Sequence, residues 1–191
     1  MAPRIVLASS SPRRREILSA LGLAFETRPA DVDESLRDGE PAFEAAERLA
    51  REKASAVAGG LPDALVVAAD TLVVLEGEAL GKPKDRADAR RTLSRLAGRA
   101  HEVVTGVALA RDGRLVSGRD VTRVHFAPMT PAEVDAYVAS GEPDDRAGSY
   151  AIQGIGGLFV ARVEGSPSNV VGLPVRLLYT LAAELGVDLK P

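Results

Sequence analysis

The chain has no cysteine, no tryptophan and only two histidines, His101 and His125. Without cysteine it can form no disulfide and no thiolate-bound zinc site, and it cannot use a cysteine nucleophile. Two histidines cannot make a histidine-rich metal cluster within one chain. A catalytic metal must therefore be held by carboxylates, and oxygen ligands of this kind favour Mg²⁺ or Mn²⁺.

The chain also has no excess of positive charge and few aromatic residues. Lys plus Arg number 24 against 27 Asp plus Glu, a net charge of −3, and aromatic residues make up 4% of the chain. Proteins that bind nucleic acid usually carry a positive excess and aromatic side chains on which bases stack. No apolar run approaches the ~20 residues that span a bilayer, and no signal peptide precedes the first apolar run. We therefore expect a cytoplasmic protein with no nucleic-acid or membrane partner.

Hydrophobic residues are plentiful, at 46% of 191 residues, which is enough for a folded core. Short apolar runs alternate with helical patterns, which predicts an α/β fold. We expect residues 1–191 to form a single domain with a mixed, twisted sheet flanked by helices, its helix-rich middle making a second lobe. The expected strands are 4–8, 65–69, 71–75, 103–110, 115–126 and 159–163. The expected helices follow the N-caps Ser11, Asp85 and Thr130 or cover residues 42–58 and 174–185.

Three consecutive arginines follow the first expected strand, in the segment SSSPRRR at 9–15. A helix N-terminus already carries partial positive charge and free N–H groups, so arginines there are unfavourable unless an anion neutralises them. Ser9, Arg13 and Arg14 therefore suggest a phosphate cradle. The alternative is a solvated basic turn. The glycine spacing of nucleotide-binding loops is absent.

Two charged residues fall at positions that the pattern marks as buried. Lys53 lies on the apolar stripe of its helix, where an unpaired ammonium is costly, unless it extends past the helix to solvent. Asp70 ends the apolar run 65–69 and precedes a second run. A carboxylate between two buried strands must be paired, metal-bound or protonated, so Asp70 is the candidate general base. The alternative is a structural aspartate that caps a turn.

Weaker signals lie in three loops. Lys82 follows Gly81, which permits close approach to a ligand. The acidic run 31–34 includes Glu34, which could contribute a metal carboxylate. Gln153, beside Gly154, offers an amide donor and acceptor that match the edge of a uracil or thymine ring. We interpret His101 as structural.

In combination these segments resemble the Maf family of nucleoside triphosphate pyrophosphatases. The matching motifs, in chain order, are LASSSPRR at 7–14, REK at 51–53, ADT at 69–71, GKP at 81–83, HEVVTG at 101–106, GEP at 141–143, AGSYAIQG at 147–154 and NVVGLP at 169–174. Each motif is modest alone. The full set, in this order across nearly the whole chain, is highly specific.

The resemblance implies a fold similar to that of inosine triphosphate pyrophosphatases, with a cleft between two lobes. It implies hydrolysis of a nucleoside triphosphate to the monophosphate and pyrophosphate with a divalent cation, Mg²⁺ or Mn²⁺. The aspartate of the ADT motif, here Asp70, is the proton acceptor proposed for the family. A homodimer is also implied, and the family name adds a link to septum formation and cell division.

Three positions separate branches of the family. The branch acting on dTTP and UTP has the residues found here as Arg13, Thr71 and Gln153. A similar branch that prefers 7-methyl-GTP has tryptophan, glutamine and glutamate instead. Arg146 departs from the family, which more often has lysine there.

The resulting hypothesis is a dTTP and UTP pyrophosphatase that cleans the nucleotide pool. Asp70 would activate water, Glu34 and Asp70 would lie near the metal, and Thr71 and Gln153 would contact the pyrimidine. The triphosphate would be held by Ser9, Arg13, Arg14, Lys53 and Lys82. The alternatives are a 7-methyl-GTP pyrophosphatase and a non-catalytic nucleotide sensor that regulates septation.

Overall fold

The computed structural model describes residues 4–61 and 63–190. The strands are β1 (Arg4–Leu7), β2 (Phe25–Thr27), β3 (Ala64–Leu75), β4 (Glu78–Leu80), β5 (Ala100–Arg111), β6 (Arg114–Phe126) and β7 (Val160–Glu164). The α-helices are α1 (Pro12–Ala20), α2 (Ala42–Ala58), α3 (Arg86–Leu96), α4 (Pro131–Ala139), α5 (Pro167–Val171) and α6 (Val175–Glu184). Three short 3₁₀ turns are η1 (Glu142–Asp145), η2 (Ala147–Ser149) and η3 (Ile155–Phe159). Among these helices, none has the length and apolar character that crossing a membrane requires.

The strands form one mixed sheet in the order β2-β1-β3-β5-β6-β7, with β4 added to the edge of β3. Strand β1 runs parallel to β2 and β3, whereas β3, β5, β6 and β7 are joined by antiparallel pairs. The mixed α/β architecture expected from the sequence is confirmed.

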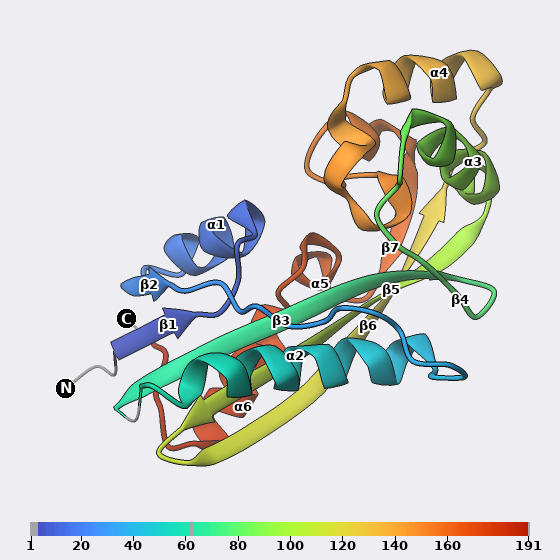
Figure 1. Cartoon of the computed structure of the whole chain (residues 1–191). Helices are drawn as coiled ribbons and strands as arrows, with labels where there is room; N and C mark the ends of the chain where they lie inside the picture. Colours follow the sequence, from blue (N-terminus) through green and yellow to red (C-terminus); the bar gives the residue numbers. More distant parts are fainter. Residues whose placement is uncertain (1–3, 62, 191) are drawn as a thin grey trace.

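Helices cover both faces of the sheet (Figure 1). Side chains alternate between faces along a strand. One face of β1, β3 and β5 packs on the inner stripe of α2, which includes Ala50, Ala54 and Val57. The opposite face packs on Leu18 of α1 and on Leu178 of α6. Neighbouring residues of a central strand therefore face different helices.

Helices α3 and α4 lie together beyond one end of the sheet, with the 3₁₀ turns beside them (Figure 1). They share a separate hydrophobic cluster with the far parts of β3, β5 and β6. Its largest fully buried members include Leu75, Leu93, Leu96 and Tyr137. This part of the molecule is the second lobe that the helix-rich middle of the sequence indicated.

The sequence prediction was wrong about strand β3. It divided the segment into two strands at Asp70, but β3 continues through that residue, pairing with β5 from Val66 to Val74. Residue 70 remains in the strand because its carboxylate has a cationic partner, described below. Its neighbour on β5 is Gly106, whose missing side chain lets α2 pack closely on the sheet.

One edge of β3 is open around Asp70. Strand β1 pairs with β3 only as far as Leu7 opposite Val67, and β4 pairs with it from Val73 onward. Between these points, residues 68–72 have no neighbouring strand on that side within the described chain. The turn that leaves β1 toward α1 lies at this opening, so the sheet itself creates a gap into which a ligand can reach.

Gly106 lets α2 lie directly on the sheet. A Cβ atom at this position would collide with the backbone of α2 at Ala46 and Glu47. These are backbone atoms, so the helix would have to move to make room. The same helix carries Lys53, about two turns further along.

Replacing Gly106 with Ala should therefore displace α2. We expect the free energy of unfolding to fall by about 2 kcal/mol, as in other overpacked cores, measured by urea denaturation. The matched control is Gly59→Ala, because a Cβ there meets nothing within 4 Å and its backbone is helical. Equal stability of the two variants would show that α2 can adjust without cost.

Candidate active site

A cleft of about 480 Å³ opens at the gap in the edge of β3. It lies between the β1–α1 turn and the segment that follows η1 in the second lobe. All the residues predicted for the site line this cleft, namely Ser9, Arg13, Arg14, Glu34, Lys53, Asp70, Thr71, Lys82 and Gln153. The structure thus brings together residues separated by up to 144 positions in the chain.

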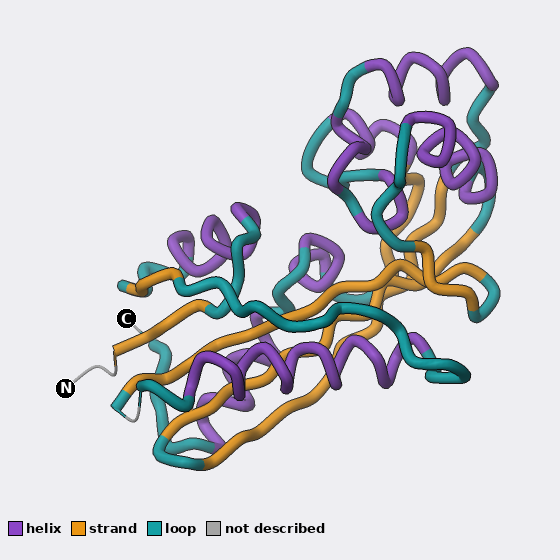
Figure 2. Tube along the Cα trace, in the orientation of Figure 1, coloured by secondary structure: helices purple, strands orange, loops and turns teal. Residues whose placement is uncertain are grey.

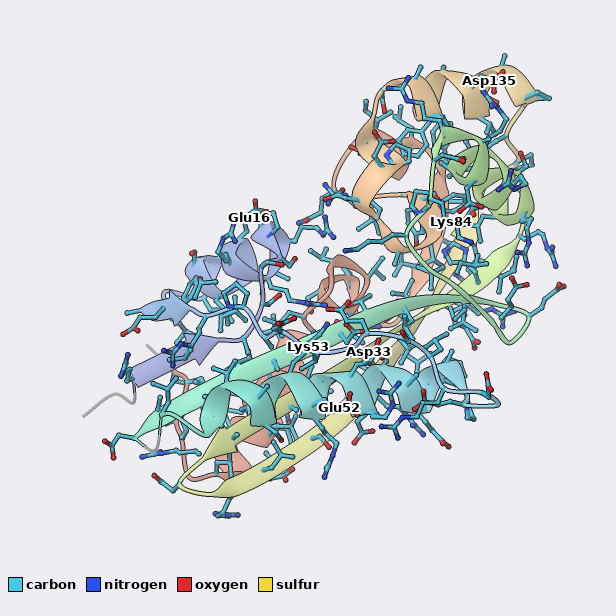
Figure 3. All side chains as sticks on the ribbon, in the orientation of Figure 1. Glu16, Asp33, Glu52, Lys53, Lys84 and Asp135 are labelled. Atoms are coloured by element: carbon cyan, nitrogen blue, oxygen red, sulfur yellow. The ribbon has the colours of Figure 1, made fainter. Side chains whose placement is uncertain are left out.

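At the base of the cleft Lys53 and Asp70 form a buried ion pair. Asp70 faces α2, and its Oδ1 accepts a hydrogen bond of 2.5 Å from Nζ of Lys53. The two residues are only 6% and 7% exposed. Figure 3 shows Lys53 where α2 passes over β3. The expectation that both lie at buried positions is confirmed, and each charge compensates the other.

A second carboxylate reaches the same ammonium. Glu34 lies on the loop from β2 to α2, which crosses over the sheet in Figure 2. Its Oε1 lies 2.8 Å from Nζ of Lys53. Burial alone would raise the pKa of Glu34, but the hydrogen bond and charge of Lys53, with the charge of Lys82, lower it below its ordinary value. Glu34 is therefore ionised at neutral pH.

On the opposite face of β3, the Thr71 side chain contacts Arg14. Nη2 of Arg14 donates to the Thr71 hydroxyl at 3.1 Å, Nη1 donates to Oγ of Ser9 at 3.1 Å, and Nε donates to the Gly172 carbonyl at 2.9 Å. Burial lowers the pKa of Arg14, although the nearby Asp70 charge opposes this. An arginine remains protonated at neutral pH, so these contacts fix a half-buried cation beside the cleft.

The start of α1 presents hydrogen-bond donors that an anion could accept from. Ser11 occupies the N-cap position as predicted, but its side chain makes no capping hydrogen bond. Its own N–H instead donates to Oγ of Ser9. Nη1 of Arg13 is buried and has no hydrogen-bond partner among the described residues. A buried cationic donor without a partner is unfavourable, and an anion in the cleft would supply that partner.

Lys82 and Gln153 approach the cleft from the second lobe. Both are exposed and make no hydrogen bond within the described part of the chain. Lys82 follows β4, and Gln153 lies in the turn before η3. Their side chains are thus available to a ligand.

The predicted set of site residues left out several residues around this cleft, including Arg146, which the sequence marked only as a departure from the family. Arg146 lines the cleft, with Nη1 at 2.9 Å from Oδ1 of Asp145 and with a buried Nε that has no partner in residues 4–61 and 63–190. Behind Thr71, the hydroxyl of Thr105 lies at 2.9 Å and donates to the Asn169 carbonyl. The motifs at 101–106 and 169–174 contained these two residues, but no charge anomaly marked them.

Tyr150 forms part of the cleft wall and is held from behind by His101. Nε2 of His101 lies 2.8 Å from the Tyr150 hydroxyl, and both rings pack edge-on against Phe126. Burial, with a smaller contribution from His125, lowers the pKa of His101 to about 4. The imidazole is therefore neutral at pH 7, which agrees with the structural role expected for it.

The carboxylates of the cleft suit a metal bound together with substrate. Within the described residues no three His, Asp or Glu side chains are grouped as metal ligands. Asp70 and Glu34 offer two carboxylates, both already in contact with Lys53. Mg²⁺ commonly uses one or two carboxylates plus phosphate oxygens and water, so this donor set fits a cation that arrives with a phosphate ligand.

Comparison with known proteins agrees with the motifs. The family model described as Maf-like protein matches residues 4–185. A "dTTP/UTP pyrophosphatase" of Anaeromyxobacter sp. strain Fw109-5 is 59% identical over 92% of this chain and 86% of that protein. Another of the same name from Chromobacterium violaceum is 50% identical over 97% and 96%.

Among solved structures, a HAM1 protein from Coxiella burnetii covers 97% of this chain and 99% of its own, with a TM-score of 0.52 and 20% identity. This likeness concerns the fold alone. It confirms the fold expected from the sequence.

The neutral His101 predicts acid sensitivity. Because its pKa is lower in the folded state, its contribution to stability is complete above about pH 6.5 and is lost as the pH falls toward 4. The loss from this group should approach about 3 kcal/mol. Urea denaturation between pH 7 and pH 4 measures it, and His101→Gln should show a shallower decline. A variant with the same pH profile as the parent would contradict this assignment.

Proposed function

Since the chain belongs to the Maf family, we propose that it is a nucleoside triphosphate pyrophosphatase acting on dTTP and UTP. It hydrolyses the bond between the α- and β-phosphates and releases the nucleoside monophosphate and pyrophosphate. The observation that carries the proposal is the buried aspartate, paired with Lys53 and surrounded by cations in one cleft. A polyanionic substrate and a water-activating carboxylate require this combination.

The cations of the cleft hold the triphosphate. Within residues 4–61 and 63–190, Arg13 offers a buried donor without a partner, and the start of α1 offers free N–H groups beside it. Arg14 is fixed in place by Ser9, Thr71 and the Gly172 carbonyl. Charge-assisted hydrogen bonds to phosphate are stronger than neutral ones. Lys82, across the cleft, contributes a further charge toward the phosphate chain.

Asp70 orients the attacking water and accepts its proton. Its Oδ1 is occupied by Lys53, while Oδ2 accepts no hydrogen bond among the described residues and is available to water. The water oxygen attacks the α-phosphorus, the bond to the bridging oxygen breaks, and pyrophosphate leaves. A Mg²⁺ or Mn²⁺ ion held by Glu34 and Asp70 would neutralise charge on the phosphates. Lys53 keeps the two carboxylates close to each other.

Base recognition is assigned to Gln153 and Thr71. The Gln153 amide has one acceptor oxygen and an NH₂ donor, which match the N3–H and a carbonyl of uracil or thymine. Thr71 lines the cleft, but its hydroxyl is already shared between Arg14 and Thr105. Its contribution therefore includes the positioning of Arg14.

The cellular setting follows from the resemblance. The enzyme removes unwanted pyrimidine nucleotides from the pool, works in the cytoplasm and assembles as a homodimer. The homodimer is what the family resemblance implies, and the cytoplasmic location and the role in the nucleotide pool belong to the same proposal.

A substrate panel tests the proposed function. Purified protein with Mg²⁺ or Mn²⁺ is incubated with dTTP, UTP, CTP, ATP, GTP and 7-methyl-GTP, and pyrophosphate is measured. We expect dTTP and UTP to be hydrolysed with the highest kcat/KM. A preference for 7-methyl-GTP would contradict the assignment of Gln153, and tight binding without pyrophosphate release would indicate a nucleotide sensor.

Replacing Asp70 with Asn should lower kcat by at least about 100-fold, because the amide retains the shape but cannot accept the proton. Steady-state pyrophosphate release measures this, with circular dichroism to show that the fold is retained. The control is Asp85→Asn, because Asp85 caps α3 outside the cleft and asparagine also caps helices. Near-parental turnover in Asp70→Asn would refute the role of the carboxylate as base.

A further inference from the structure

Gln153 lies in a loop that two residues of the second lobe hold in place. The loop comprises residues 151–156, which follow η2 and include the first two residues of η3. Glu142 accepts hydrogen bonds from the N–H groups of Ile155 at 3.0 Å and Gly156 at 2.9 Å. All of these contacts lie on the C-terminal side of Gln153.

Tyr137 holds the other side of the same loop. Its hydroxyl accepts a hydrogen bond of 3.1 Å from the N–H of Ala151 and donates one of 2.6 Å to Oε2 of Glu142. The tyrosine ring is almost fully buried and packs against Phe159. One tyrosine and one glutamate therefore bind the backbone on both sides of Gln153.

The glycines of the loop are required for this contact. A Cβ at Gly154 would collide with the Glu142 carboxylate, and one at Gly156 would collide with the Tyr137 hydroxyl. The loop backbone thus lies directly against Tyr137 and Glu142. Glu142 belongs to the motif GEP at 141–143, to which the proposed function assigns no role.

We propose that the Tyr137–Glu142 pair is a positioning device that sets base discrimination by fixing the loop of Gln153. Neither residue lines the cleft, so neither needs to touch the nucleotide. The proposal rests on the proposed function, in which Gln153 reads the base. Discrimination between UTP and CTP depends on the placement of one amide, because the two bases differ in the donors and acceptors at their edge.

The main variant is Glu142→Gln. A glutamine has one acceptor oxygen and an NH₂ group that opposes the N–H donors of the loop. We expect the ratio of kcat/KM for UTP over CTP to fall about tenfold, within the range of coupling between residues of one hydrogen-bond network. The fall should come mainly through the KM for UTP. Backbone amide exchange at Ile155 and Gly156 should become faster without substrate.

Tyr137→Phe is the second variant, because it keeps the buried ring and removes only the hydroxyl. It should change the same ratio in the same direction, so a failure of Glu142→Gln to fold does not end the test. The matched control is Glu133→Gln, which weakens the capping box of α4 in the same lobe but does not contact the loop. It should leave the ratio unchanged.

Gln153→Ala distinguishes the possible failures. If Glu142 acts through Gln153, adding Glu142→Gln to Gln153→Ala should lower the ratio no further. If Gln153→Ala alone leaves the ratio unchanged, base reading by Gln153 fails and the positioning role fails with it. If Gln153→Ala lowers the ratio but Glu142→Gln and Tyr137→Phe do not, only the positioning role is overturned. An equal, additive loss in the double variant also overturns it.

Discussion

The site depends on one buried ion pair. Asp70 lies in the middle of a central strand, where an unpaired carboxylate would lose its hydration without compensation. The Lys53 ammonium on α2 supplies that compensation at 2.5 Å. Each residue makes the position of the other tolerable, because breaking a buried pair by removing one partner costs about 3–5 kcal/mol. The position of α2 on the sheet, and the glycine opposite Asp70 that permits it, therefore support the proposed catalytic arrangement.

Because side chains alternate between the faces of β3, neighbouring residues of this strand contact different layers of the fold at the site. Asp70 faces α2 and its lysine, while Thr71, the next residue, faces the opposite layer and Arg14. Both line the cleft because β1 ends at Leu7 and β4 begins its pairing only at Val73. One strand with an open edge can thus carry a carboxylate at Asp70 and, through Thr71, hold the Arg14 cation of α1 beside the same ligand. An edge fully covered by a neighbouring strand would bury both.

The sequence predicted the layered α/β fold because its apolar periods and turn residues are strong. It marked Lys53 and Asp70 because charges at buried positions are costly and therefore informative, and both are buried in the structure. It divided β3 wrongly for the same reason: the charge at Asp70 resembles an interruption unless its partner on α2 is known. Thr105 and Tyr150 were not identified as supporting residues because they are uncharged, and only their contacts reveal them.

In the proposed function, most of the phosphate contacts and the base selection come from different parts of the chain, with Lys82 of the second lobe as the exception. The cations Arg13, Arg14 and Lys53 are carried by the sheet and the helices on its faces, which belong to the two cores beneath the cleft. Gln153 is carried by a loop of the second lobe, whose contacts with Tyr137 and Glu142 are independent of those cores. A change in that loop can therefore alter which base is accepted while the ion pair and phosphate contacts remain. Within such a fold, substrate preference can diverge without rebuilding the chemistry, because the two are stabilised by separate interactions.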